Sequence, residues 1–115
     1  MAVARARIAQ AEASAEGALA EFDGAWLRAL EETESALTNY GRELERLAAL
    51  RRGRAQAGEA ARIARLRYQA GRESFQIVLD TEQANAQLDA AVAQSEAQLS
   101  DNLVGLFLAL GGGWQ

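Results

Sequence analysis

The sequence predicts an all-α protein, a long antiparallel coiled-coil hairpin with unequal arms, and three observations lead to this fold class. The 115 residues include no proline, and the 50% apolar share consists mostly of alanine and leucine, which lose little side-chain freedom in a helix. Larger apolar residues recur at steps of three and four, which is the spacing of a coiled-coil seam. One glycine-containing break near residue 71 divides this pattern into two helices.

The first helix is expected over residues 3–69, within a first segment 1–69, and would be on the order of 100 Å long at 1.5 Å per residue. Its pattern weakens through residues 51–58, and it recovers at Ile63 and Leu66. The predicted seam residues of this helix are Leu19, Phe22, Trp26, Leu30, Thr33, Leu37, Tyr40, Leu44 and Leu47.

A turn is expected over residues 70–74. Gly71 suits the position after a helix, because glycine adopts the left-handed conformation that closes the last carbonyl groups. Ser74 can cap the second helix through its hydroxyl group. Ile77, three residues later, cannot complete a capping box, which needs a glutamate or glutamine there.

The second helix is expected over residues 75–110, followed by a glycine-rich end over 111–115. Its predicted seam residues are Leu88, Val92, Ser95, Leu99, Leu103, Leu106 and Leu110. Helices joined by so short a turn must run antiparallel. Charge favours this pairing, because seven arginines and one glutamate lie between Leu50 and Arg72, whereas six acids and no base follow Arg72.

The two arms differ in length, since a fold about Gly71 places Leu110 beside roughly residue 32. About the first 30 residues then have no partner within the chain, although they include Leu19, Phe22 and Trp26. An apolar stripe of this kind needs cover. We therefore expect the chain to be incomplete, oligomeric, or both.

Composition argues against several classes of function. Histidine and cysteine are absent and the carboxylates are scattered, so we expect no catalytic residues, no metal site, no cofactor and no enzyme activity. The formal charge of −4 disfavours nucleic acid as a partner. The longest apolar run, over residues 103–114, is shorter than the roughly 20 residues that span a bilayer as a helix.

Three stretches resemble the TolC-like family of outer-membrane efflux proteins. Residues 68–71 (Tyr-Gln-Ala-Gly) with 78–80 (Val-Leu-Asp) are similar to that family's Tyr-x-x-Gly…Val-Leu-Asp turn. Residues 109–114 match its common ending, Ala-Leu-Gly-Gly-Gly-Trp. Residues 30–37, followed by Tyr40, resemble the mid-helix stretch that precedes the turn.

This resemblance implies a fragment of an α-barrel, to which the full-length family adds an outer-membrane β-barrel. Residues 1–69 would form a long tunnel helix, 70–74 the turn at the periplasmic tip, and 75–110 the returning helix. The implied function is passive conduction of exported solutes by a homotrimer, in type I secretion or in multidrug or metal efflux. The implied partners are a periplasmic adaptor and an inner-membrane pump, and the segment would project from the outer membrane into the periplasm.

The resemblance also implies roles for single residues. Asp80 matches the acidic residue at the tunnel constriction, where three-fold symmetry would make a ring of carboxylates. The turn residues that would contact the adaptor are Tyr68, Gly71, Arg72, Ser74 and Phe75. Glu73 stands where some members carry a basic latch residue, so that latch is not implied here.

Other interpretations of the residues themselves stay open. An acid in the first two turns of a helix, such as Asp80, also favours the positive end of the helix dipole. Tyr68 can simply pack at the turn. The chain as a whole could instead be a free-standing, self-associating coiled-coil module, or the helical hairpin of a periplasmic adaptor.

Overall fold

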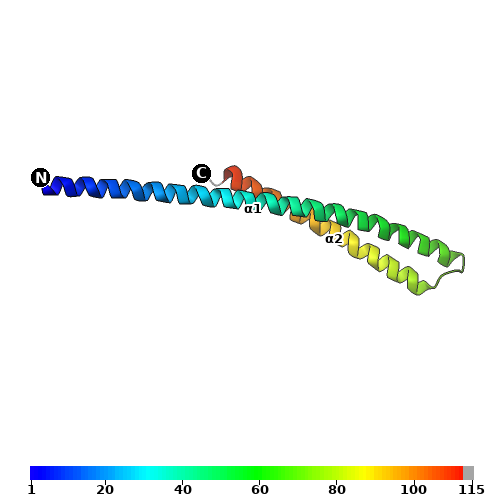
Figure 1. Ribbon diagram of the computed structural model, residues 1–115. Coiled ribbons are helices and arrows are strands. Elements are labelled where there is room, and N and C mark those ends of the chain that lie inside the picture. The colour runs from blue at the N-terminus through cyan, green and yellow to red at the C-terminus, as the bar shows by residue number, and fades with distance from the viewer. Residues whose placement is uncertain (113–115) are drawn as a thin grey trace.

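The computed structural model describes residues 1–112 and confirms the all-α hairpin with unequal arms. Helix α1 covers Ala2–Gln69, helix α2 covers Phe75–Phe107, and a π-helical turn, η1, covers Leu108–Gly112. The helices lie side by side and antiparallel, and the N-terminal part of α1 extends well beyond the end of α2 (Figure 1). The rod measures 104 × 20 × 15 Å.

The two helices pack through a seam, an unbroken series of buried or half-buried residues at alternating steps of three and four. In α1 the seam comprises Ala29, Thr33, Ala36, Tyr40, Glu43, Leu47, Leu50, Arg54, Ala57, Ala61 and Ala64. In α2 and η1 it comprises Val78, Thr81, Asn85, Leu88, Val92, Ser95, Leu99, Asn102, Leu106 and Ala109. This 3.5-residue period is the heptad pattern of a left-handed supercoil.

The predicted seam of the first helix is partly wrong. Leu30, Leu37 and Leu44 lie beside the seam and are 44%, 52% and 44% exposed. Ile63 and Leu66 are also exposed, whereas Thr33, Tyr40 and Leu47 do belong to the seam. Small residues hold most of the other seam positions in α1, because they leave room for larger side chains of α2; the alanines among them are Ala29, Ala36, Ala57, Ala61 and Ala64.

The seam of the second helix agrees better with the sequence pattern. Four predicted residues lie in the seam as expected: Leu88, Val92, Ser95 and Leu99. Beyond them Leu106 is also in the seam, but Leu103 and Leu110 are 51% and 61% exposed. Asn102 and Ala109 hold those seam positions instead, so the heptad phase outweighs side-chain size here.

The turn closes as predicted. Gly71 has φ of 72°, a conformation that costs a side-chain-bearing residue energy. The Gly71 N–H donates to the Tyr68 carbonyl at 2.9 Å, and the Arg72 N–H donates to the Arg67 carbonyl at 2.8 Å, which is the Schellman arrangement. Ser74 then caps α2, because its Oγ accepts from the Ile77 N–H at 3.4 Å.

The end of the second helix differs from the prediction. The α-helix stops at Phe107, and the π-helical turn continues through Gly111 to Gly112, so the first two glycines do not terminate the helical backbone. Glycine lowers the preference for regular α-helix, which favours a local change of helix type. Residues 113–115 of the predicted glycine-rich end, which include Gly113 and Trp114, lie outside the described residues.

The N-terminal arm has no cover within the described part of the chain. The intrachain seam begins at Ala29 in α1, and of the residues before it only Gly24 is not exposed. Leu19, Phe22 and Trp26 are consequently 63%, 66% and 52% exposed. Among residues 1–112 there is also no helix with both the length and the apolar character needed to cross a membrane.

Candidate functional site

Two aromatic rings meet at the hairpin tip, one from each helix. The centroids of Tyr68 and Phe75 lie 5.4 Å apart with an angle of 52° between the ring planes. This tilted geometry is favourable for aromatic pairs. The rings remain 46% and 53% exposed as residues, so the turn is braced by a pair that also presents apolar surface to the surroundings.

Charged residues adjoin this aromatic pair in the sequence. Glu73 is half-buried, its carboxylate lies 4.0 Å from the Arg67 guanidinium, and it accepts from the Ser74 N–H at 3.3 Å. The Arg72 side chain is exposed next to it. The structure therefore places the five predicted turn residues between the end of α1 and the start of α2, with the rings of Tyr68 and Phe75 in contact.

Asp80 lies apart from this group, on the exposed surface of α2. It follows Phe75 by five residues, which is roughly 7 Å along the helix axis. Its Oδ1 accepts a hydrogen bond from the Gln76 Nε2 at 2.9 Å. This i, i+4 pair orients the carboxylate but leaves it open to solvent.

Ion pairs join the two helices along one edge, in agreement with the charge asymmetry of the sequence. The Arg51 guanidinium lies 3.2 Å from the Glu96 carboxylate, and Arg65 pairs with Glu82. Arg54 and Asp89 are 3.9 Å apart. The side chains of these pairs are 38–60% exposed, so each pair contributes at most about 1 kcal/mol and chiefly supports the register.

Two ion pairs lie within α1, Arg46 with Glu43 and Arg62 with Glu59. The hydrogen bond from the Arg62 guanidinium lowers the pKa of the Glu59 carboxyl below its ordinary value. Because both groups are exposed, this pair marks local helix electrostatics and not a functional site.

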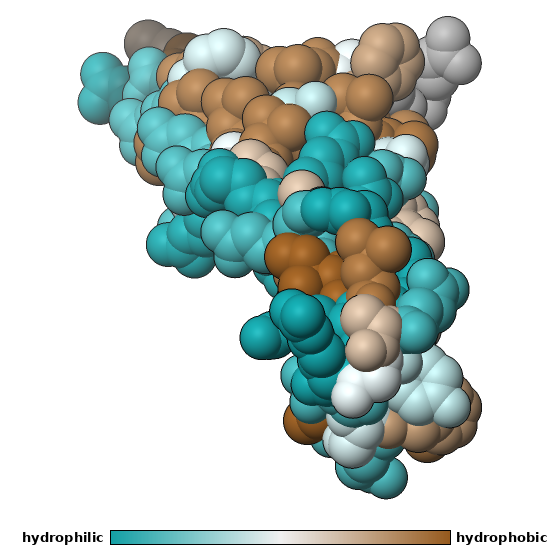
Figure 2. Space-filling model, turned by 90° about the vertical axis from the view of Figure 1, so that its right-hand side faces the viewer, coloured by the Kyte–Doolittle hydropathy of each residue, from teal (hydrophilic) through white to brown (hydrophobic). Residues whose placement is uncertain are grey.

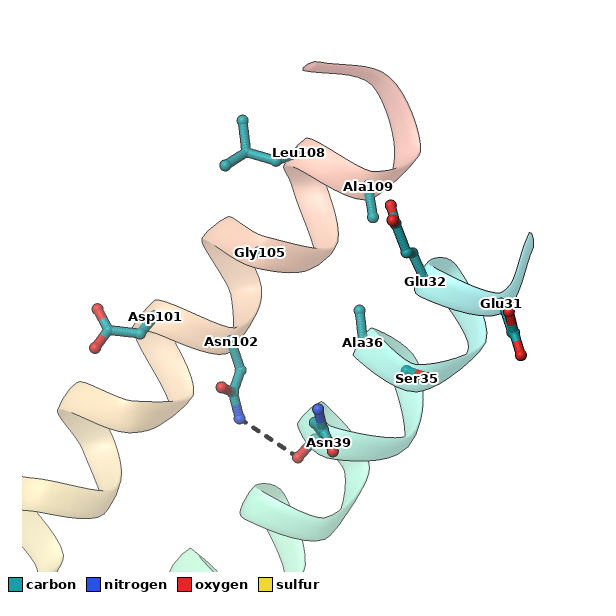
Figure 3. Close-up of a pocket in the computed structure, with 10 residues that line it drawn as sticks. All are labelled: Glu31, Glu32, Ser35, Ala36, Asn39, Asp101, Asn102, Gly105, Leu108 and Ala109. Atoms are coloured by element: carbon teal, nitrogen blue, oxygen red, sulfur yellow. Dashed lines mark hydrogen bonds between the residues drawn. The ribbon is translucent and has the colours of Figure 1, made fainter. Parts of the chain in front are cut away.

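An open groove of about 610 Å³ at the other end of the paired region was not foreseen from the sequence. Glu31, Glu32, Asp101 and Asn102 are among its lining residues (Figure 3). Figure 3 shows the carboxylates of Glu31 and Asp101 pointing away from each other on opposite sides. Residues 1–112 as a whole contain no group of three or more histidine, cysteine, aspartate or glutamate side chains placed to hold a metal ion.

Apolar surface is open to solvent along the hairpin. The view from the tip shows brown apolar areas lying between teal polar ones (Figure 2). The largest exposures in the C-terminal part are those of Val104, Phe107 and Leu110, at 60%, 75% and 61%. A helix that is apolar on several faces is usually buried in a larger assembly.

Comparison with known proteins explains this combination of features. Residues 2–112 match the family described as outer membrane efflux protein. Outer membrane protein OprJ of Pseudomonas aeruginosa is 32% identical over 110 residues, covering 96% of this chain and 23% of OprJ. A solved structure of the outer-membrane channel OprN superposes with a TM-score of 0.76 at 39% identity, over 96% of this chain and 25% of that one.

These matches favour the channel family over the free-standing module and the adaptor hairpin. The chain spans about a quarter of the length of the relatives it matches. The family match covers both helices and the turn between them. The chain therefore belongs to the outer membrane efflux protein family.

Proposed function

We propose that the protein works as part of a trimeric outer-membrane channel that passively conducts exported solutes. The observation that carries this proposal is the match of the whole described hairpin to a solved outer-membrane channel, at a TM-score of 0.76 and 39% identity. The channel would act with a periplasmic adaptor and an inner-membrane pump, which supplies the energy. The hairpin itself would catalyse no reaction.

In this proposal the hairpin is a piece of the tunnel wall, with 1–69 as the long helix, 70–74 as the periplasmic tip and 75–110 as the returning helix. The exposed apolar residues support it. Leu30, Leu37 and Leu44 lie seven residues apart on one side of α1, beside the intrachain seam, and are each about half exposed. Such a stripe offers a second packing face for a neighbouring helix.

The tip is the proposed contact site for the adaptor, through Tyr68, Gly71, Arg72, Ser74 and Phe75. Exposed aromatic side chains and arginine are enriched where proteins bind one another. The tight turn, braced by the Tyr68–Phe75 ring pair, would present these groups with little loss of conformational freedom on binding.

Asp80 is the proposed pore-lining residue at the constriction. Three-fold symmetry would place three Asp80 carboxylates around one axis, where they attract cations and repel anions. Ile77 stands one turn earlier and carries no charge, so this chain would contribute one acidic ring.

Ion selectivity tests the proposal. Asp80→Asn in the full-length protein, reconstituted in planar bilayers, should lower the permeability ratio of cations to anions. Asp101→Asn removes the same charge from the same helix, farther from the tip, and serves as the matched control. An unchanged ratio for Asp80→Asn would remove Asp80 from the pore.

A further inference from the structure

Ser95 and Glu43 form a hydrogen bond inside the seam. Ser95 is fully buried at 0% exposure, and its Oγ donates to the Glu43 Oε1 at 2.6 Å. The Glu43 side chain is only 12% exposed, and the Arg46 Nη1 lies 3.4 Å from the same carboxylate oxygen. The short distance and the charged acceptor are those of a strong hydrogen bond.

This bond differs from the other polar contacts between the helices. The hydrogen bonds of Arg51 with Glu96 and of Arg65 with Glu82 are exposed, as is the one from Asn102 to the Asn39 carbonyl. Exposed pairs compete with water and contribute little. Among residues 1–112, Ser95–Glu43 is thus the cross-helix hydrogen bond that is shielded from solvent.

Apolar packing holds the seam between Ser95 and the turn, where Leu47, Ala61, Ala64, Val78 and Val92 are buried. Apolar burial is not directional, so by itself it does not fix how one helix is rotated against the other. A buried polar pair, by contrast, is costly to break, because both groups have already lost their contacts with water and find no new hydrogen-bond partner in the interior.

We propose that the Ser95–Glu43 hydrogen bond anchors α2 to α1 about 30 Å along the axis from Phe75. The anchor fixes how α2 is rotated and placed against α1, as single polar residues do in coiled-coil seams. This inference does not depend on what the channel conducts.

Amide hydrogen exchange on the full-length protein tests the anchor. Ser95→Ala should speed exchange over 92–99 about tenfold or more, as expected for loss of a hydrogen bond to a charged group. If Ser95 only filled space in the seam, exchange over 92–99 should instead slow in Ser95→Ala, because alanine is a better helix former than serine and is slightly smaller.

Ser100→Ala is the matched control. Ser100 lies on the same helix, and its Oγ donates to the Glu96 carbonyl within that helix at 3.2 Å. This variant should leave exchange over 92–99 unchanged or slower. Exchange over 92–99 that is unchanged or slower in Ser95→Ala would overturn the proposal.

A double-mutant cycle separates the hydrogen bond from independent effects. Because the bond can be lost only once, Glu43→Ala combined with Ser95→Ala should speed exchange about tenfold less than the product of the single effects. Glu43→Gln keeps an acceptor oxygen without the charge, so it should retain part of the protection that Glu43→Ala loses. Single effects that multiply fully would overturn the anchor.

Discussion

Replacing Gly71 with alanine tests whether the hairpin depends on the left-handed closure of its turn. Gly71 has φ of 72°, and a Cβ built there meets no atom within 4 Å. The cost is therefore backbone strain alone, about 1–2 kcal/mol for an L-residue in this conformation. Since 1.4 kcal/mol corresponds to a factor of ten, local opening of the turn should become about five- to thirtyfold more frequent.

Amide hydrogen exchange of Gly71 and Arg72, whose N–H groups close the turn, measures this opening in the full-length protein. Gly41→Ala is an informative control, because Gly41 lies within α1 and a Cβ there also meets nothing within 4 Å. In a helix the same substitution is stabilising by up to about 1 kcal/mol, so exchange near residue 41 should slow. Unchanged or slower turn exchange in Gly71→Ala would refute the reasoning.

Three further substitutions test the seam, the cap and an ion pair. Ala61→Leu overfills a fully buried seam position and should destabilise the hairpin by about 1–3 kcal/mol in thermal unfolding, whereas Ala60→Leu on the exposed surface should change it by less than about 0.5 kcal/mol. Ser74→Ala removes the cap of α2 and should raise exchange at its first turn by the equivalent of about 1 kcal/mol, while Ser74→Asp keeps an acceptor and should not. Arg62→Met should return the pKa of Glu59 toward its ordinary value of 4.5 in an NMR titration. Because that pKa is lowered in the folded chain, the pair contributes to folding stability above pH 4.5. This contribution is lost as the pH falls through the lowered value. A Glu59 pKa that does not move in Arg62→Met, equal effects at residues 60 and 61, or a neutral Ser74→Ala would each contradict the corresponding contact.

Local chemistry made the turn predictable from the sequence. Gly71 is needed where φ is positive, and Ser74 supplies a short hydroxyl at the start of a helix, so both act through their own neighbours. The antiparallel pairing followed from the length of the turn. The charge asymmetry then indicated contacts such as Arg51 with Glu96, because opposite charges favour adjacent edges.

The seam of α1 could not be predicted fully, because the pattern was followed through the largest apolar side chains. Leu37 and Leu44 fit steps of three and four as well as Ala36 and Glu43 do, and only the partner helix decides between the two faces. A glutamate in the seam gives no apolar signal at all. Its place depends on Ser95, which is 52 residues away in the chain.

The candidate site, too, could be predicted only in part from the sequence. Tyr68 and Phe75 come together because they lie near the two ends of the short turn, and the sequence alone already places them there. The surroundings of Asp80 in a pore depend on other copies of the chain and on other segments of the protein. Its proposed role therefore follows from resemblance and from its exposure on α2, and remains a prediction.

The most direct test of the central claim, that this hairpin lines a solute-conducting channel, is single-channel recording of the full-length protein with Asp80→Cys in an otherwise cysteine-free background. If the three side chains face the pore, a bulky thiol reagent should reduce the conductance sharply and a negatively charged one should favour cations. Conductance and selectivity that stay constant, although labelling of the cysteine is complete, would place Asp80 outside the conducting path and contradict the account.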